Sequence, residues 1–81
     1  MQRLSAKIDY EGHLAAIGAA LRRHRIQKGF SQEGLALATG IDRSHMGKIE
    51  RGERNLTILN LIRIAHALDS TPSELLQSAG M

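Results

Sequence analysis

Apolar residues recur at the three- and four-residue spacing of an α-helix along most of this 81-residue chain. Segments with this spacing begin at residues that can cap a helix and end near glycines. They predict helices over residues 13–28, 32–39, 43–51 and 58–68, and a last helix that begins at residue 72. We therefore expect an all-α fold, a compact five-helix bundle over residues 13–78, with an N-terminal extension (1–12) and a frayed C-terminus (79–81).

The stretch from Phe30 to Glu53, FSQEGLALATGIDRSHMGKIERGE, reads as two short helices held at a fixed angle. Ser31 can cap the first helix, and Gly40 supplies the positive φ that ends a helix abruptly. Asp42 can cap the second helix, because its carboxylate is favourable beside the amide dipoles of a helix start. The rest of the chain is expected to support this unit.

The helix over residues 43–51 has two chemically different sides. Met46 and Ile49 point to a core. Gly47, on the other side, has no side chain to contribute, so we expect it to allow close backbone approach or adaptation of the helix, at a helix-propensity cost of ~1 kcal/mol relative to Ala. A polar and mostly basic side suits the major groove of DNA. Its members are Arg43, Ser44, His45, Gly47, Lys48 and Arg51.

Positive charge gathers in the same part of the chain. The net charge is +3, and between Arg22 and Arg63 there are nine Lys and Arg residues against four acidic ones. This excess favours a polyanionic partner, and the alternative is a basic face that only meets solvent. The two-helix unit in the same part of the chain favours a polyanionic partner over a face that only meets solvent.

The helix over residues 58–68 is unusually apolar. One stripe, made of Ile58, Leu61, Ile64, Ala65 and Leu68, is enough for a core face. A second stripe beside it contains Leu59, Ile62 and His66. Because a domain this small has little interior left, we expect the second stripe, with help from the last helix, to form a homodimer interface.

Other functions find little support in the composition. The chain has no cysteine, and its four histidines lack metal-ligand spacing, so no metal and no cofactor are expected. The serines begin helices and no base accompanies them, so we do not expect an enzyme or a small-molecule ligand. No apolar run approaches the ~18 residues that span a bilayer, which predicts a soluble, cytoplasmic protein without membrane contact.

The run SQEGLALATGIDRSHMGKIERGERNLT resembles the helix-turn-helix of the Cro/cI-type (XRE) regulator family, in its Ser-Gln start, Leu-Ala pair, central Gly and Ile-Glu-Arg-Gly ending. The likeness extends from about Ile17 to Leu76 and looks most like the controller proteins of restriction-modification systems. It departs from the family at Gly34, His45 and Gly47. The resemblance implies a λ-repressor-like fold and a homodimeric transcription regulator that binds a palindromic operator in double-stranded DNA.

The resemblance also implies roles for particular residues. Arg25 and Glu50 would form an ion pair that ties the first helix to the recognition helix. From their positions on the helix, base contacts are expected from Arg43, Ser44, His45 and Lys48. Arg43 leads because it begins the helix and because Arg paired with guanine is the commonest specific contact; the alternatives for Arg43 are a phosphate contact or a local pair with a nearby acid. Phosphate contacts are expected from Gln32, Arg51, Arg54 and Asn55, with Lys28 and Arg22 as further candidates.

Two alternatives for the function remain open: an antitoxin-type module, or a helix-turn-helix kept for protein interaction. An RNA-binding role is disfavoured because aromatic platforms for stacking bases are missing. For residues 1–12, in order of preference, we consider a frayed extension, a turn packed on a dimer partner, and an arm that touches DNA through Arg3 and Lys7.

Overall fold

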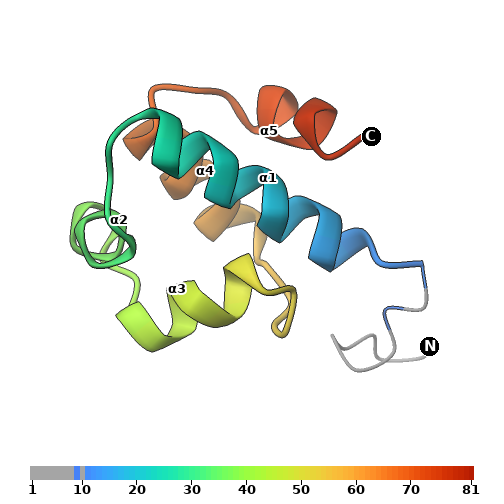
Figure 1. Cartoon of the computed structure of the whole chain (residues 1–81), viewed down its shortest axis with the longest axis horizontal. Coiled ribbons are helices and arrows are strands. Elements are labelled where there is room, and N and C mark those ends of the chain that lie inside the picture. Colours follow the sequence, from blue (N-terminus) through green and yellow to red (C-terminus); the bar gives the residue numbers. More distant parts are fainter. Residues whose placement is uncertain (1–8, 10) are drawn as a thin grey trace.

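A computed structural model describes residues 9 and 11–81, which form five α-helices and no β-strand (Figure 1). The prediction of an all-α, five-helix fold is confirmed, with helix ends within about one residue of those expected. The helices are α1 (His13–Gln27), α2 (Gln32–Thr39), α3 (Arg43–Glu50), α4 (Ile58–Ala67) and α5 (Pro72–Ser78). The roles considered for Arg3 and Lys7 lie outside the described residues.

Side-chain caps begin four of the five helices. Each cap oxygen accepts a hydrogen bond from a backbone N–H in the first turn, which otherwise has no partner. α1 begins differently: Gly12 has a positive φ, and the Asp9 carboxylate accepts from the N–H groups of His13 and Leu14 at 3.1 and 2.8 Å. The four capping residues are Ser31, Asp42, Thr57 and Thr71.

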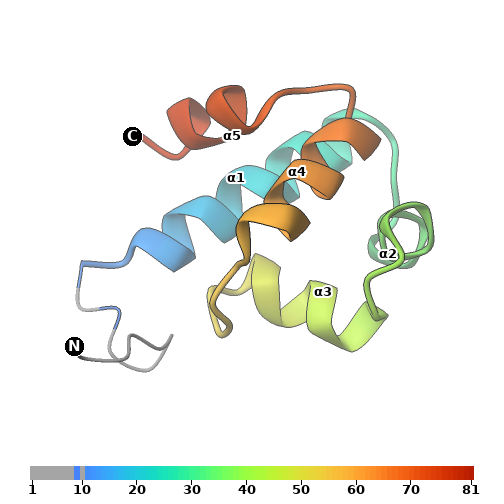
Figure 2. The same ribbon diagram turned by 180° about the vertical axis from the view of Figure 1, so that it is seen from behind.

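Helix α1 occupies the middle of the bundle, between α3 and α5 (Figures 1 and 2). α2 contacts both α3 and α4, so that α3 is held by α1 and α2 together. The core is aliphatic, as the scarcity of aromatic residues predicts. Its largest fully buried side chains are Leu21, Leu35, Met46, Ile64, Leu68 and Leu75.

Two glycines let α1 approach the end of α3 very closely. A Cβ at Gly18 would lie 2.5 Å from the carbonyl oxygens of Ile49 and Glu50. Gly52 has a φ of +73°, and a Cβ there would lie 2.6 Å from the Cα of Ala15. Neither position has room for a side chain, so the C-terminal end of α3 rests directly on the backbone of α1.

One core assignment was wrong. Ile58 was expected in the core stripe but is 70% exposed. It is the first residue of α4 and precedes Ile62 by four positions, so the two share one side of the helix. Ile58 therefore belongs with the second stripe.

The C-terminal residues, expected to fray, are hydrogen-bonded in this structure. The N–H groups of Gly80 and Met81 donate to the carbonyls of Gln77 and Leu76 at 2.9 and 3.0 Å. With Gly80 at positive φ, these bonds close the last turn of α5 in the manner of a glycine C-cap.

Candidate nucleic-acid interface

Helix α3 lies at the edge of the bundle (Figures 1 and 2). Its inner side faces α1, and no helix of the described residues covers its outer side. Met46, Ile49 and Glu50 are buried on its inner side. Its outer side carries the residues predicted to contact bases: Arg43 and Ser44 are exposed, and His45 and Lys48 are half-buried. The structure thus brings these four side chains together on one short helix.

The first residues of α3 differ in whether their polar side chains already have hydrogen-bond partners within the protein. The Ser44 hydroxyl donates to the Asp42 carboxylate at 2.6 Å, and the Ser44 N–H donates to it at 3.1 Å. These bonds, the hydroxyl bond first, lower the pKa of the Asp42 carboxyl. Within the described residues, Arg43 forms neither an ion pair nor a hydrogen bond with its guanidinium. Arg43 is therefore the long donor at the start of α3 that is left for an outside acceptor.

The predicted phosphate-contacting residues lie at the two ends of the α2–α3 unit. Gln32 is the first residue of α2, and Arg51 is the residue that ends α3. Arg54 and Asn55 are exposed in the loop that follows α3. The further candidates Lys28 and Arg22 are exposed as well, at the end of α1 and on its surface.

Arg51 has an acidic partner that the sequence interpretation missed. Its Nε donates to both carboxylate oxygens of Glu53, at 3.0 and 3.1 Å. This contact lowers the pKa of Glu53 and raises that of Arg51. Arg51 and Glu53 are two positions apart, on either side of the turn at Gly52, and this spacing could have indicated the ion pair.

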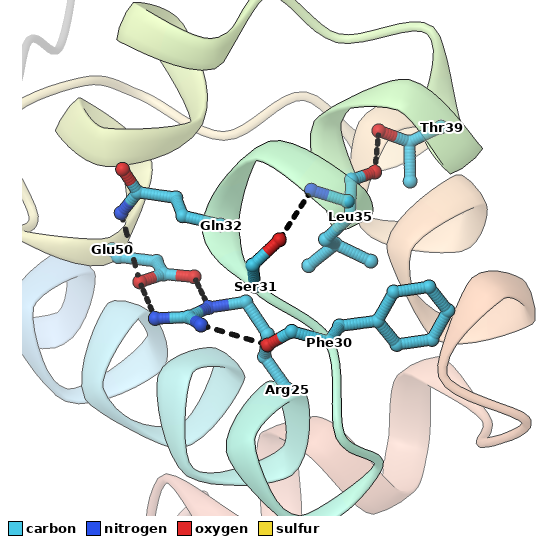
Figure 3. Close-up of polar contacts among 8 residues, drawn as sticks. Arg25, Phe30, Ser31, Gln32, Leu35, Thr39 and Glu50 are labelled. Atoms are coloured by element: carbon cyan, nitrogen blue, oxygen red, sulfur yellow. Dashed lines mark hydrogen bonds and ion pairs between the residues drawn. The ribbon is translucent and has the colours of Figure 1, made fainter.

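Arg25 and Glu50, for which the resemblance implies an ion pair, are in contact in the structure (Figure 3). Arg25 Nε and Nη2 donate to the two Glu50 oxygens at 2.6 and 3.1 Å, and both side chains are buried. Arg25 Nη1 also donates to the Phe30 carbonyl at 2.9 Å, and Gln32 Nε2 donates to Glu50 at 3.2 Å. This network joins α1, the start of α2 and α3, and so fixes the angle at which α3 is presented.

On α4, the residues predicted for a dimer interface lie on its outward side. Leu59 is 68% exposed, Ile62 is half-buried and His66 is exposed. Together with Ile58 they form a continuous strip, because all four lie within one side of the helix. We call these residues, Ile58, Leu59, Ile62 and His66, the α4 strip.

Among the described residues, no group of three or more His, Asp or Glu side chains is arranged to hold a metal ion. Within the same residues, no helix combines the length and the apolarity needed to cross a membrane.

Comparison with known proteins defines the class of this chain. A helix-turn-helix family model matches residues 21–75. The chain is 39% identical over 61 residues to the control protein C.SmaI of Serratia marcescens, an alignment that covers 75% of this chain and 73% of that protein. The chain therefore belongs to the helix-turn-helix family of DNA-binding transcription regulators.

Solved structures agree with this membership. The restriction-modification controller protein C.AhdI from Aeromonas hydrophila is 48% identical and superposes with a TM-score of 0.75, covering 76% of this chain and 94% of that one. SinR, described as the master regulator for biofilm formation and solved in complex with DNA, is 33% identical with a TM-score of 0.71. That match covers 74% of this chain and 97% of the chain in that structure.

Proposed function

We propose that this protein is a controller-type transcription regulator that acts in the cytoplasm as a homodimer on an imperfect palindromic operator. One observation carries the proposal: a basic helix face stands outward on α3 while the buried Arg25–Glu50 pair holds α3 from within. The names of the relatives, control and controller proteins, support the regulatory role.

In this proposal α3 enters the major groove with its N-terminal end toward the bases. Arg43, exposed and without an internal partner among the described residues, can direct its planar fork at guanine O6 and N7. Ser44, His45 and Lys48 follow on the same face. Because the Ser44 hydroxyl proton is donated to Asp42, Ser44 would act as an acceptor, for example from a base amino group.

Backbone contacts would set the register of α3 in the groove. Gln32 and Arg51 lie beside Gly47 on the outer side of α3, and Arg54 and Asn55 follow in the exposed loop. Such contacts position a protein on the duplex and do not read sequence.

The second copy would dock on the α4 strip. Leu59 and Ile58 are about two-thirds exposed, and apolar side chains grouped on one helix side in this way favour a protein partner. A two-fold axis through this strip gives a self-complementary interface. It would place the two α3 helices about one DNA turn apart, roughly 34 Å, and so require inverted half-sites.

Equilibrium binding to duplex DNA across a salt series, combined with sedimentation of the complex, tests the proposal. We expect log K to fall steeply with log salt and two protein chains to bind each duplex. Salt-insensitive or absent binding to duplexes, together with a stable complex with another protein, would contradict the proposal and favour an antitoxin-type or protein-interaction role.

A further inference from the structure

Gly47 lies on the outer side of α3, yet it is buried. It follows Arg43 and precedes Arg51 by four residues, so it belongs to the same side of the helix as these two arginines. What covers it are side chains: a Cβ at Gly47 would lie 3.1 Å from Arg51 Nη1 and 3.3 Å from Gln32 Oε1. The ends of the Gln32 and Arg51 side chains therefore both lie over the bare backbone of Gly47, Gln32 from the start of α2 and Arg51 from the residue after α3.

Each of the two covering side chains is also held by a carboxylate. Gln32 Nε2 donates to Glu50, and in Figure 3 its amide oxygen points away from that carboxylate. Arg51 Nε donates to both oxygens of Glu53. One N–H of Gln32 and the terminal N–H groups of Arg51 still have donor capacity, which is what a phosphate needs.

A methyl group at Gly47 would disturb the side chains and leave the helix in place. Contacts of 3.1 and 3.3 Å are tighter than ordinary van der Waals distances, so the neighbours must shift by a few tenths of an ångström. Both neighbours are the ends of flexible side chains, and no backbone atom lies in the way. Since alanine also favours a helix more than glycine does, the free protein should not lose stability.

We propose that Gly47 is a positioning residue for DNA binding, which by lacking a side chain lets Gln32 and Arg51 close over α3 as a pair. The proposal rests on the proposed function, in which these two side chains contact the DNA backbone. It gives Gly47 a role different from close approach of the α3 backbone to the DNA itself, because the space above Gly47 is filled by protein.

Gly47→Ala should keep or raise the melting temperature and weaken binding to all duplexes roughly tenfold, the size of one charge-assisted contact. The decisive comparison repeats the substitution in a Gln32→Ala/Arg51→Ala background. There the added methyl group has nothing to displace, so it should weaken binding less than about twofold. The proposal is overturned if Gly47→Ala leaves the affinity unchanged in the otherwise wild-type protein. It is also overturned if Gly47→Ala weakens binding equally in both backgrounds, a result that would point to a clash between the methyl group and DNA.

A measurement without DNA keeps the positioning role separate from the proposed function. In the free protein, Gly47→Ala should shift the NMR signals of the Gln32 side-chain amide and of Arg51 Nε–H. Unchanged signals would overturn the positioning role by themselves. If wild-type protein fails to bind any duplex at low salt, the proposed function falls and this proposal falls with it. If wild-type protein binds and Gly47→Ala binds equally well, only the positioning role is lost.

Discussion

Helices α3 and α4 are built on the same plan and differ in what they turn outward. Each buries one side in the common core, through Met46 and Ile49 on α3 and through Leu61 and Ile64 on α4. The outward side is basic on α3, whereas on α4 it carries the mainly apolar α4 strip. A core needs only one face of each helix, so the chemistry of the remaining face indicates the partner: a polyanion for α3 and a second apolar surface for α4.

The inner sides also differ. α4 is held by apolar packing, which is not directional, whereas α3 is held in addition by the bidentate Arg25–Glu50 pair. A helix that reads bases must be held at a fixed angle, because shifts of an ångström change which base edge a side chain reaches. Directional bonds behind α3 meet that need.

The largest expected effect comes from breaking the inner support of α3. Glu50→Ala leaves the buried Arg25 charge without its partner, so we expect a loss of ~3 kcal/mol or more of stability. For a domain of this size that lowers the melting temperature by roughly 12 °C or more. Glu53→Ala, which breaks the exposed pair with Arg51, is the control and should lower the melting temperature far less. Equal melting of Glu50→Ala and wild type would show Glu50 to be a solvated residue.

A charge placed in the α4 strip should break the proposed dimer while the fold persists. We expect Ile62→Glu to weaken self-association by about 2 kcal/mol or more, a typical hot-spot loss, at least roughly thirtyfold in the dissociation constant. Leu37→Glu is the matched control, because Leu37 is an exposed leucine of α2 outside the strip. Sedimentation measures both. The interface is wrong if the Ile62 variant still dimerises, or if wild type is a monomer at tens of micromolar.

On the outer side of α3, Arg43→Ala should remove sequence reading. We expect a loss of ~1–3 kcal/mol on the preferred site, a much smaller loss on random duplex, and relaxed preference at one G·C position per half-site. Arg63→Ala, an exposed arginine on α4, is the control for lost charge alone. If selection with the Arg43 variant returned the same consensus with equal stringency, Lys48 would become the leading base reader.

Arg54→Ala should weaken binding without changing sequence preference. Because Arg54 is proposed to contact the DNA backbone beyond the end of α3, its loss should affect all duplexes alike and reduce the slope of log K against log salt by about one unit. Titrations at several salt concentrations on preferred and random duplexes provide the measurement. A loss confined to one sequence would contradict the phosphate assignment.

The smallest expected effect concerns the cap of α3. The pKa of Asp42 lies below its usual 3.8 in the folded protein, so the charged carboxylate adds stability above that pH, and this stability is lost as pH falls through the folded pKa. Asp42→Asn keeps a capping side chain but cannot titrate. Urea unfolding between pH 6 and about 2.5 should show a flatter acid decline for the variant, and identical declines would exclude Asp42 as a contributor.

Local features of the fold were predictable from the sequence, because they depend on residues a few positions apart. The caps at Ser31, Asp42 and Thr57 bond to groups within three residues, and the five helices follow from spacing. The close approach of Gly18 to the end of α3 was not predictable, since it depends on how two helices cross. Ile58 was misplaced because periodicity does not show where the core ends along a helix.

The site was predicted unevenly for a similar reason. The face of α3 follows from helical spacing, so the grouping of Arg43 and Lys48 could be foreseen. The contact of Gln32 with Glu50 and the cover over Gly47 join residues of two helices. Only the structure places these groups together and shows that Gln32 bonds to Glu50 and covers Gly47.

Selection of bound duplexes from a random pool tests most directly whether α3 reads DNA while the α4 strip pairs two copies. We predict two inverted half-sites with centres about 10 base pairs apart, each with a preferred G·C position. A single half-site without its inverted partner would contradict the dimer on the α4 strip, and a pool without any enriched sequence would contradict base reading by α3.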